Sequence, residues 1–266
     1  MNQPIKTIAI VGAGTMGVSL AALFLAKGFN VVLKTRRQEE TARIAEKVKF
    51  LAAKSQANLT ANLTVTHEFS PLSSCHLVIE AIEENLAAKK QVLAEIEKIC
   101  PNAIYASNTS SLSIAALANG LSDKRKFVGM HFFNPAHKMQ LVEIVKTQFT
   151  SEAAIFQVEE VAKALGKTPI VVTDSPGFVV NRLLMPFLLD AVKLRDAGVA
   201  SEMDIDTAVK MGLNHPMGPF ELLDLIGLDV FVSILKQLNF EAPESVVEMV
   251  KKGKLGRKTK DGFYEY

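Results

Sequence analysis

The stretch that decides the fold reads Ile8-Ala9-Ile10-Val11-Gly12-Ala13-Gly14-Thr15-Met16-Gly17, and an apolar segment follows it as far as Lys27. The residues before the glycines are typical of a buried strand, and those after them of a buried helix. In a Gly-x-Gly-x-x-Gly turn, Gly12 permits the tight turn, Gly14 lets the backbone approach a pyrophosphate, and Gly17 lets the helix pack on the strand. The sequence therefore predicts a dinucleotide-binding unit, with a glycine-rich turn that binds no nucleotide as the alternative.

Beyond this turn, short β-branched runs alternate with helical segments, which predicts a parallel sheet covered by helices. The expected strands are Thr7–Val11, Asn30–Lys34, Leu77–Glu80, Ala103–Ser107, Phe127–Phe132, Gln140–Val145 and Thr168–Thr173. The expected helices are Val18–Lys27, Glu39–Lys54, Leu86–Ile99 and Ser151–Leu165. Turn residues 174–177 end this pattern.

The rest of the chain is predicted to be helical. Helical apolar spacing is found in Asn181–Arg195, Ser201–Met211 and Phe220–Leu238, with Gly198, Gly212 and Gly227 where helix ends are expected. We therefore predict an α/β fold: a Rossmann-like doubly wound sheet in residues 1–177 and a smaller all-helical domain in residues 178–266. Because so small a domain leaves apolar surface exposed when alone, we expect a homodimer that forms through it.

Composition excludes several classes of partner. The chain has 266 residues, with 30 basic and 28 acidic side chains and a net charge of +2. This balance does not favour a duplex nucleic acid or a membrane surface as partner. Any anionic ligand must therefore be bound by the residues of a local site. Residues 7–26 carry no charge, but their three glycines argue against a membrane span. Cys75 and Cys100 fit neither a zinc site nor a disulfide framework, so we expect no metal and a cytoplasmic location.

The end of the second expected strand bears on which dinucleotide binds. An acid at this point normally binds the ribose 2′-hydroxyl of NAD, but the run Val31 to Arg37 contains none. Thr35 lies about 20 residues after the glycines, and Arg36 follows it. Threonine and guanidinium can bind a 2′-phosphate that a carboxylate would repel, so we predict NAD(P) with NADP favoured. If Arg36 and Arg37 are only a solvated pair, the chain uses NAD weakly or uses both cofactors.

Two polar stretches suggest catalysis. The run Ala106 to Ser113 places hydroxyl and amide groups at the carboxyl end of an expected strand, where ligands lie in open α/β sheets. His131 and Glu143 lie on two apolar strands joined by a Pro-containing turn. Neighbouring strands can bring the carboxylate to the imidazole, which fixes its tautomer and stabilises the cation formed in general acid–base catalysis. A lone strand histidine is usually structural, but an unpaired glutamate in an apolar run would be costly to bury.

With these motifs the sequence resembles the 3-hydroxyacyl-CoA dehydrogenase family, especially its short bacterial 3-hydroxybutyryl-CoA dehydrogenases. The matching segments cover nearly the whole chain in order: Val11–Gly17, Val78–Ile82, Ala106–Leu112, Gly129–Pro135, Leu141–Ile144, Pro176–Arg182, Asn214–Pro219 and Gly262–Tyr264. The resemblance implies an N-terminal NAD(P)-binding domain, a helical C-terminal domain that dimerises, and an acyl-CoA substrate.

The resemblance also implies roles for individual residues. His131 matches the family's catalytic base and Glu143 its partner. Ser110 matches the serine that hydrogen-bonds the reacting oxygen, and Asn181 the asparagine that helps to hold the substrate. With the glycine turn and the strand-end residues, the expected cofactor-binding set is Gly12, Gly14, Thr15, Met16, Gly17, Thr35, Arg36, Glu84, Lys89, Asn108 and Asn134.

The reaction implied is hydride transfer between a nicotinamide and C3 of a short-chain 3-hydroxyacyl-CoA, with His131 as general acid/base. One departure concerns the segment before Leu77, which is shorter than in most relatives, where a helical arm helps to hold CoA. Two alternatives are therefore kept. The first is a dehydrogenase of a free hydroxy acid, as in the related gulonate dehydrogenase branch, and the second is a nucleotide-binding protein without turnover.

Overall fold

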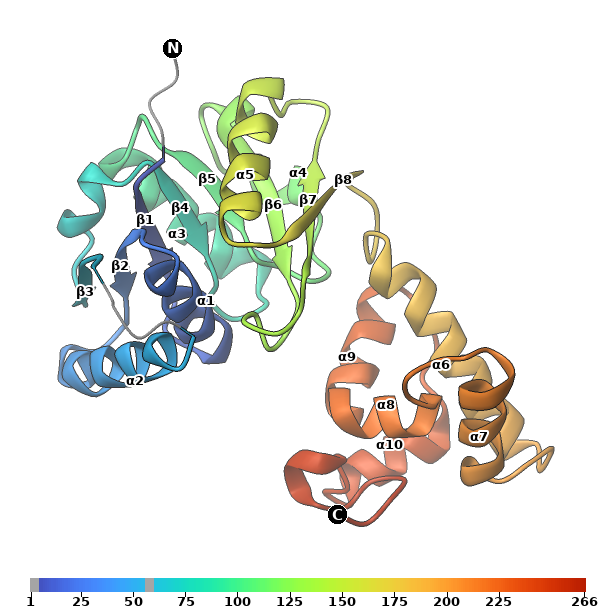
Figure 1. Ribbon diagram of the computed structural model, residues 1–266. Helices are drawn as coiled ribbons and strands as arrows, with labels where there is room; N and C mark the ends of the chain where they lie inside the picture. Colours follow the sequence, from blue (N-terminus) through green and yellow to red (C-terminus); the bar gives the residue numbers. More distant parts are fainter. Residues whose placement is uncertain (1–4, 56–59) are drawn as a thin grey trace. The chain divides into compact units, whose positions relative to one another are not determined.

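The computed structural model describes residues 5–55 and 60–266. These residues form two compact units, of which the first ends at Phe178 and the second runs from Val179 to Tyr266 (Figure 1). In the described part of the chain, no helix is long and apolar enough to cross a membrane.

Within the described residues, the first unit is built on an eight-stranded sheet in the order β3-β2-β1-β4-β5-β6-β7-β8. Its strands are β1 (Thr7–Val11), β2 (Asn30–Lys34), β3 (Leu63–Thr66), β4 (Leu77–Glu80), β5 (Ile104–Ser107), β6 (Phe127–Phe132), β7 (Leu141–Lys146) and β8 (Thr168–Thr173). All neighbouring strands are parallel except β6 and β7, which are antiparallel. The order 3-2-1-4-5-6 of the first six strands is that of a doubly wound dinucleotide-binding sheet.

Helices cover both faces of this sheet, because successive strand residues point to opposite sides. Ile8 and Ile10 pack on the side of α1, α2 and α5, whereas Ala9 and Val11 pack on the side of α3 and α4 (Figure 1). The helices are α1 (Thr15–Ala26), α2 (Thr41–Ala53), α3 (Leu86–Ile99), α4 (Ile114–Ala118) and α5 (Glu152–Ala164), with 3-10 turns η1 (Gln38–Glu40), η2 (Ser70–Ser74) and η3 (Lys124–Lys126).

The predicted Rossmann-like sheet is confirmed, with a strand at every predicted position. Two elements of the first unit were not predicted. β3 has only four residues, which lie largely half-buried at the edge of the sheet and lack a continuous apolar run. The five residues of α4 are too few to show a helical period. The predicted start of the first helix at Val18 is wrong, because α1 begins at Thr15 and grows directly out of the glycine turn.

The second unit is helical, as predicted, around a core that includes Leu188, Phe220 and Phe231. Its elements are α6 (Val180–Asp196), α7 (Glu202–Gly212), α8 (Pro219–Ile226), α9 (Leu228–Gln237), α10 (Glu244–Lys251) and η4 (Arg257–Thr259). The helical spacing over Phe220–Leu238 covers two helices, and the helix end expected at Gly227 is present. Gly227, with φ of 100°, ends α8 and begins a separate helix, α9. α10 was not predicted.

The three glycines of the turn meet different steric limits. A Cβ on Gly17 would lie 1.7 Å from the carbonyl oxygen of Gly12, and a Cβ on Gly12 would lie 2.5 Å from that of Ala81. Gly12 also has φ of 114°, a backbone angle that residues other than glycine rarely adopt. By contrast, a Cβ on Gly14 would meet nothing within 4 Å. Folding therefore requires Gly12 and Gly17, whereas the reason for Gly14 must lie outside the folded chain itself.

We expect Gly17→Ala to destabilise the first unit by about 2 kcal/mol or more, because β1 and α1 must separate to admit the methyl group. This loss corresponds to a Tm lower by roughly 6 °C. Gly14→Ala is the matched control, and its Tm should stay close to that of the unsubstituted protein. Thermal unfolding followed by circular dichroism measures both, and an equal loss in the two variants would contradict this steric distinction.

Candidate active site and nucleotide pocket

The polar residues of the first unit gather at one edge of the sheet, because the carboxyl ends of parallel strands lie together. Val11 of β1 pairs in register with Glu80 of β4, and Glu80 pairs with Ser107 of β5. β7 runs in the opposite direction, and its residue Glu143 pairs with His131 near the end of β6. This edge is the position where open α/β sheets bind their ligands.

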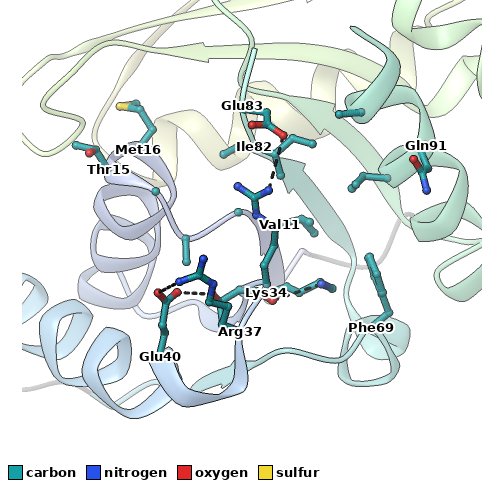
Figure 2. A pocket seen from close by; sticks show the side chains of 18 residues that line it. Val11, Thr15, Met16, Lys34, Arg37, Glu40, Phe69, Ile82, Glu83 and Gln91 are labelled. Atoms are coloured by element: carbon teal, nitrogen blue, oxygen red, sulfur yellow. Dashed lines mark hydrogen bonds and ion pairs between the residues drawn. The ribbon is translucent and has the colours of Figure 1, made fainter. Parts of the chain in front are cut away.

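A pocket of about 940 Å³ opens beside the glycine turn (Figure 2). Of the predicted cofactor-binding residues, it is lined by Gly12, Gly14, Thr15, Met16, Thr35 and Arg36. Gly17 is buried against the carbonyl of Gly12 and does not line the pocket. The open space around Gly14 leaves the backbone accessible, and the first N–H groups of α1 are suited to an anion. The pocket therefore fits the pyrophosphate of a dinucleotide.

Sequence reasoning did not find the carboxylate of Glu40 in this pocket. The run Val31 to Arg37 has no acid. The predicted helix Glu39–Lys54 begins only at Thr41, and the 3-10 turn η1 before it places Glu40 beside the end of β2. Oε1 of Glu40 lies 3.6 Å from Nη1 of Arg37 (Figure 2), and Oε2 lies 3.5 Å from the hydroxyl of Thr35. Arg37 therefore has an ion-pair partner before any ligand binds.

Arg36 and Arg43 are the other arginines near this end of the pocket. Nη1 of Arg36 lies 3.8 Å from Oε1 of Glu83, and both side chains are largely exposed. An ion pair of this length between exposed groups is weak, so Arg36 can change partner at little cost. Arg43 lies 3.9 Å from Glu40 and does not line the pocket.

A buried charge cluster joins the ends of β4 and β5 to α3. The carboxylate of Glu80 is fully buried, and it accepts hydrogen bonds from Nζ of Lys89 at 2.8 Å, from the hydroxyl of Ser107 at 2.6 Å and from the N–H of Ile82 at 2.6 Å. Lys89, only 1% exposed, also lies 3.3 Å from Oε2 of Glu84. Glu80 was missed by sequence reasoning, although a glutamate in an apolar strand was the signal that identified Glu143.

Glu84 holds the polar loop that follows β5. Its Oε1 accepts hydrogen bonds from the N–H of Ser110 at 3.0 Å, from the hydroxyl of Ser111 at 2.9 Å and from the hydroxyl of Thr109. Burial on its own would raise the pKa of Glu84, but Lys89 and these hydrogen bonds outweigh burial and hold the pKa below its usual value. Glu84 is therefore an anion that fixes the backbone of Ser110.

His131 and Glu143 form the buried pair that the sequence predicted would be brought together. Nδ1 of His131 lies 2.7 Å from Oε2 of Glu143, and the two residues are 6% and 0% exposed. A carboxylate can only accept, so Nδ1 carries the proton in this contact and Nε2 has the free lone pair. The rings of Phe133 and Phe178 lie 4.4 and 5.7 Å from the imidazole, measured between centroids. This arrangement suits a general base whose tautomer is fixed.

Asn108, Asn134 and Asn181 are the remaining predicted residues. Asn108 accepts a hydrogen bond from the N–H of Phe132 at 3.0 Å, which ties β5 to the end of β6. Asn134 is exposed just beyond β6. Asn181 is buried on α6 of the second unit. Lys89, Glu84, Asn108 and Asn134 do not line the pocket beside the glycine turn. In the described ranges, no three His, Cys, Asp or Glu side chains are placed to hold a metal ion.

The depressed pKa of Glu84 predicts a contribution to acid stability. Ionised Glu84 stabilises the fold above the unfolded pKa of about 4.3, and this contribution is lost as the pH falls through the lower folded value. In Glu84→Gln we therefore expect a smaller loss of unfolding free energy between about pH 5 and pH 2. Urea unfolding at a series of pH values measures this, with Glu83→Gln as an exposed control. Parallel curves for Glu84→Gln and the unsubstituted protein would contradict the role given to Glu84.

Known proteins resemble this chain over almost its full length. The family model described as "3-hydroxyacyl-CoA dehydrogenase, NAD binding domain" matches residues 7–175, and the one described as "3-hydroxyacyl-CoA dehydrogenase, C-terminal domain" matches residues 177–266. The mitochondrial hydroxyacyl-coenzyme A dehydrogenase of Mus musculus is 40% identical, over 98% of this chain and 91% of its own. The 3-hydroxybutyryl-CoA dehydrogenase of Clostridioides difficile is 39% identical, over 97% of this chain and 99% of its own.

A solved structure gives the same result. The crystal structure of (S)-3-hydroxybutyryl-CoA dehydrogenase from Ralstonia eutropha matches with a TM-score of 0.90 and 39% identity, over 98% of this chain and 99% of that one. The alignments extend through both units, so the similarity is not limited to the dinucleotide-binding turn. The chain belongs to the 3-hydroxyacyl-CoA dehydrogenase family.

Proposed function

We propose that the protein is an oxidoreductase that transfers a hydride between a nicotinamide cofactor and C3 of a short-chain 3-hydroxyacyl-CoA. The substrate pair is 3-hydroxybutyryl-CoA and acetoacetyl-CoA. The observation that carries this proposal is the buried contact of 2.7 Å between His131 and Glu143 at the ligand-binding edge of the sheet. The relatives named as 3-hydroxybutyryl-CoA dehydrogenases support the choice of substrate.

The side chains of this protein would handle the proton and orient the substrate. A bound nicotinamide supplies the hydride acceptor or donor. In the oxidation, Nε2 of His131 takes the proton of the 3-hydroxyl group, and Glu143 stabilises the imidazolium that forms. In the reduction, the same nitrogen returns the proton to the ketone oxygen. Ser110 donates a hydrogen bond to that oxygen, and the amide of Asn181 helps to hold the substrate.

Loss of the base or of its partner should remove most of the turnover. For His131→Gln and Glu143→Gln, we expect kcat for acetoacetyl-CoA reduction to fall by about 10²- to 10⁴-fold, because proton transfer is lost or the tautomer is no longer fixed. The Kd of the reduced cofactor, measured by fluorescence titration, should not change. His137→Gln, at an exposed histidine beyond β6, is the matched control.

Three outcomes of these assays would redirect the proposal. Near-normal turnover by His131→Gln would refute the assignment of the base. Turnover of unesterified 3-hydroxy acids with none of acetoacetyl-CoA would favour the free hydroxy acid alternative. Tight cofactor binding without turnover of either substrate class would favour the nucleotide-binding alternative.

For the cofactor, we propose a preference for NADP. Thr35 is buried at the end of β2, and the weakly paired Arg36 lines the same pocket, so the two can meet a 2′-phosphate. Glu40 opposes this preference in two ways. Its charge repels the phosphate, and its contact with Arg37 occupies a second guanidinium.

The proposed effect of Glu40 on the NADP preference can be measured from the kcat/KM values for the two cofactors. We expect Glu40→Gln to raise the ratio of kcat/KM for NADPH to that for NADH by about fivefold, because roughly 1 kcal/mol of repulsion and pairing is removed. Arg36→Ala should lower the same ratio, and Glu39→Gln is the control at the neighbouring position. An unchanged ratio in Glu40→Gln would show that Glu40 does not influence the cofactor preference. A kcat/KM for NADH that equals or exceeds the value for NADPH in the unsubstituted protein would refute the preference.

We also propose that residues 1–177 form the nucleotide-binding domain and residues 178–266 a domain that binds substrate and dimerises. In support of dimerisation, the second unit exposes large apolar side chains on α6, on α7 and just beyond α7. Leu183, Met203, Met211 and Leu213 are 60–81% exposed in the single chain. Apolar surface of this kind is typical of a protein interface.

The compartment that we propose is the cytoplasm. Cys75 and Cys100 are buried free thiols. Burial raises the pKa of Cys75 to about 12 and that of Cys100 to about 11, so both remain protonated and unreactive. Thiols of this kind suit a reducing environment.

A further inference from the structure

Phe178 has a backbone conformation that aromatic residues rarely adopt. Its φ is +52°, in the left-handed region, and it follows Gly177, whose φ is +75°. A Cβ in this region lies too close to the backbone carbonyl, so glycine is the usual residue there and asparagine the next. In the described part of the chain, Asn214, Asn239 and Lys260 are the other non-glycine residues with positive φ. The side chain of Phe178 must therefore make contacts that outweigh this strain.

One of those contacts is with the imidazole of His131. The Phe178 ring is 5% exposed, and its centroid lies 5.7 Å from that of the imidazole with the two planes inclined by 57°. The N–H of Phe178 donates to the carbonyl of Ser175 at 2.9 Å, which closes the turn that presents the ring. The ring also belongs to the apolar cluster on the α3 and α4 side of the sheet.

The imidazole needs such a contact in order to keep its orientation. The hydrogen bond to Glu143 fixes the position of Nδ1, but a single bond leaves the ring free to tilt about that atom. Phe133 contacts the imidazole with its plane inclined by 49°, and Phe178 contacts it from a separate segment of the chain. Contacts from separate segments restrict tilting, and the position of Nε2 is then determined.

We propose that Phe178 is a positioning residue that holds the His131 imidazole in the orientation required for proton transfer. The contact of its ring with the imidazole is the reason that we infer for the strained backbone of Phe178. This inference rests on the proposed role of His131 as general base.

The test uses three substitutions of Phe178 in the full chain. Phe178→Leu keeps an apolar side chain but removes the ring, Phe178→Gly removes both the ring and the strain, and Phe178→Tyr keeps the ring. Phe127→Leu is the matched control, because Phe127 is fully buried in the same cluster and, in the described part of the chain, makes no ring contact with His131. Each variant is assayed well below its own Tm.

If Phe178 positions the imidazole, kcat for acetoacetyl-CoA falls at least about tenfold in Phe178→Leu and Phe178→Gly, because a small misplacement of a catalytic group is costly. The KM for acetoacetyl-CoA and the Kd of the reduced cofactor stay close to their original values, and Phe178→Tyr restores most of kcat. Phe127→Leu lowers Tm but keeps kcat. An unchanged kcat in Phe178→Leu, or an equal loss in Phe127→Leu, overturns the proposal.

A second measurement does not depend on turnover. With ¹⁵N-labelled histidine, NMR follows the exchange of the Nδ1 proton of His131 with solvent. We expect faster exchange in Phe178→Leu than in the unsubstituted protein or in Phe127→Leu, because the tilting ring breaks its bond to Glu143. An unchanged exchange rate overturns the positioning role. If no variant turns over any substrate, the proposed function fails, and the exchange rates alone decide whether Phe178 holds the imidazole.

Discussion

A carboxylate that is buried in an apolar sheet must be given donors, and this constraint organises the site. Glu80 and Glu143 are fully buried on strands β4 and β7. Glu80 accepts hydrogen bonds from Lys89 of α3 and Ser107 of β5, and Glu143 is hydrogen-bonded to His131 of β6. Leaving either charge unpaired would cost several kcal/mol, so the partners are held as firmly as the core itself.

These two anions have different consequences because their partners differ. Lys89 lies between the carboxylates of Glu80 and Glu84, and Glu84 in turn accepts a hydrogen bond from the backbone N–H of Ser110. An imidazole can take up and release a proton, so the contact of His131 with Glu143 is suited to proton transfer. The same edge of the sheet therefore has two parts. The cluster around Glu80 and Lys89 orients hydrogen-bond donors, and the His131–Glu143 pair is suited to proton exchange.

The sequence was informative where local rules decide the structure. The strand, glycine turn and helix at the start of the chain follow from spacing alone, and the apolar runs located the strands of the sheet. The pairing of His131 with Glu143 could be predicted because each lies on an apolar strand and the strands are close in sequence. β3 and α4 are too short to show a period and were missed, whereas Gly227 marks a helix end that the sequence indicated.

Other parts of the site could not be predicted, because they depend on how the chain turns back in space. Glu40 lies beyond the end of β2, where the acid that binds the ribose normally lies, and the 3-10 turn η1 places its carboxylate beside Thr35. The contact between Phe178 and His131 joins a residue of the turn after β8 to a residue of β6, and it depends on the left-handed backbone conformation of Phe178. Glu80 is different, because the sequence places it in an apolar strand. The cost of burying an unpaired carboxylate there indicates a buried partner, as it did for Glu143.

The antiparallel pairing of β6 and β7 has a consequence for how an active molecule forms. His131 and Glu143 are direct partners in that ladder, and a shift of one residue would turn the Glu143 side chain to the opposite face of the sheet. A chain with this slip could retain its helices and most of its sheet, yet its imidazole would have no anion beside it. With the proposed role of His131, recovered activity after refolding would report the register of one strand pair, which spectroscopic measures of secondary structure do not detect.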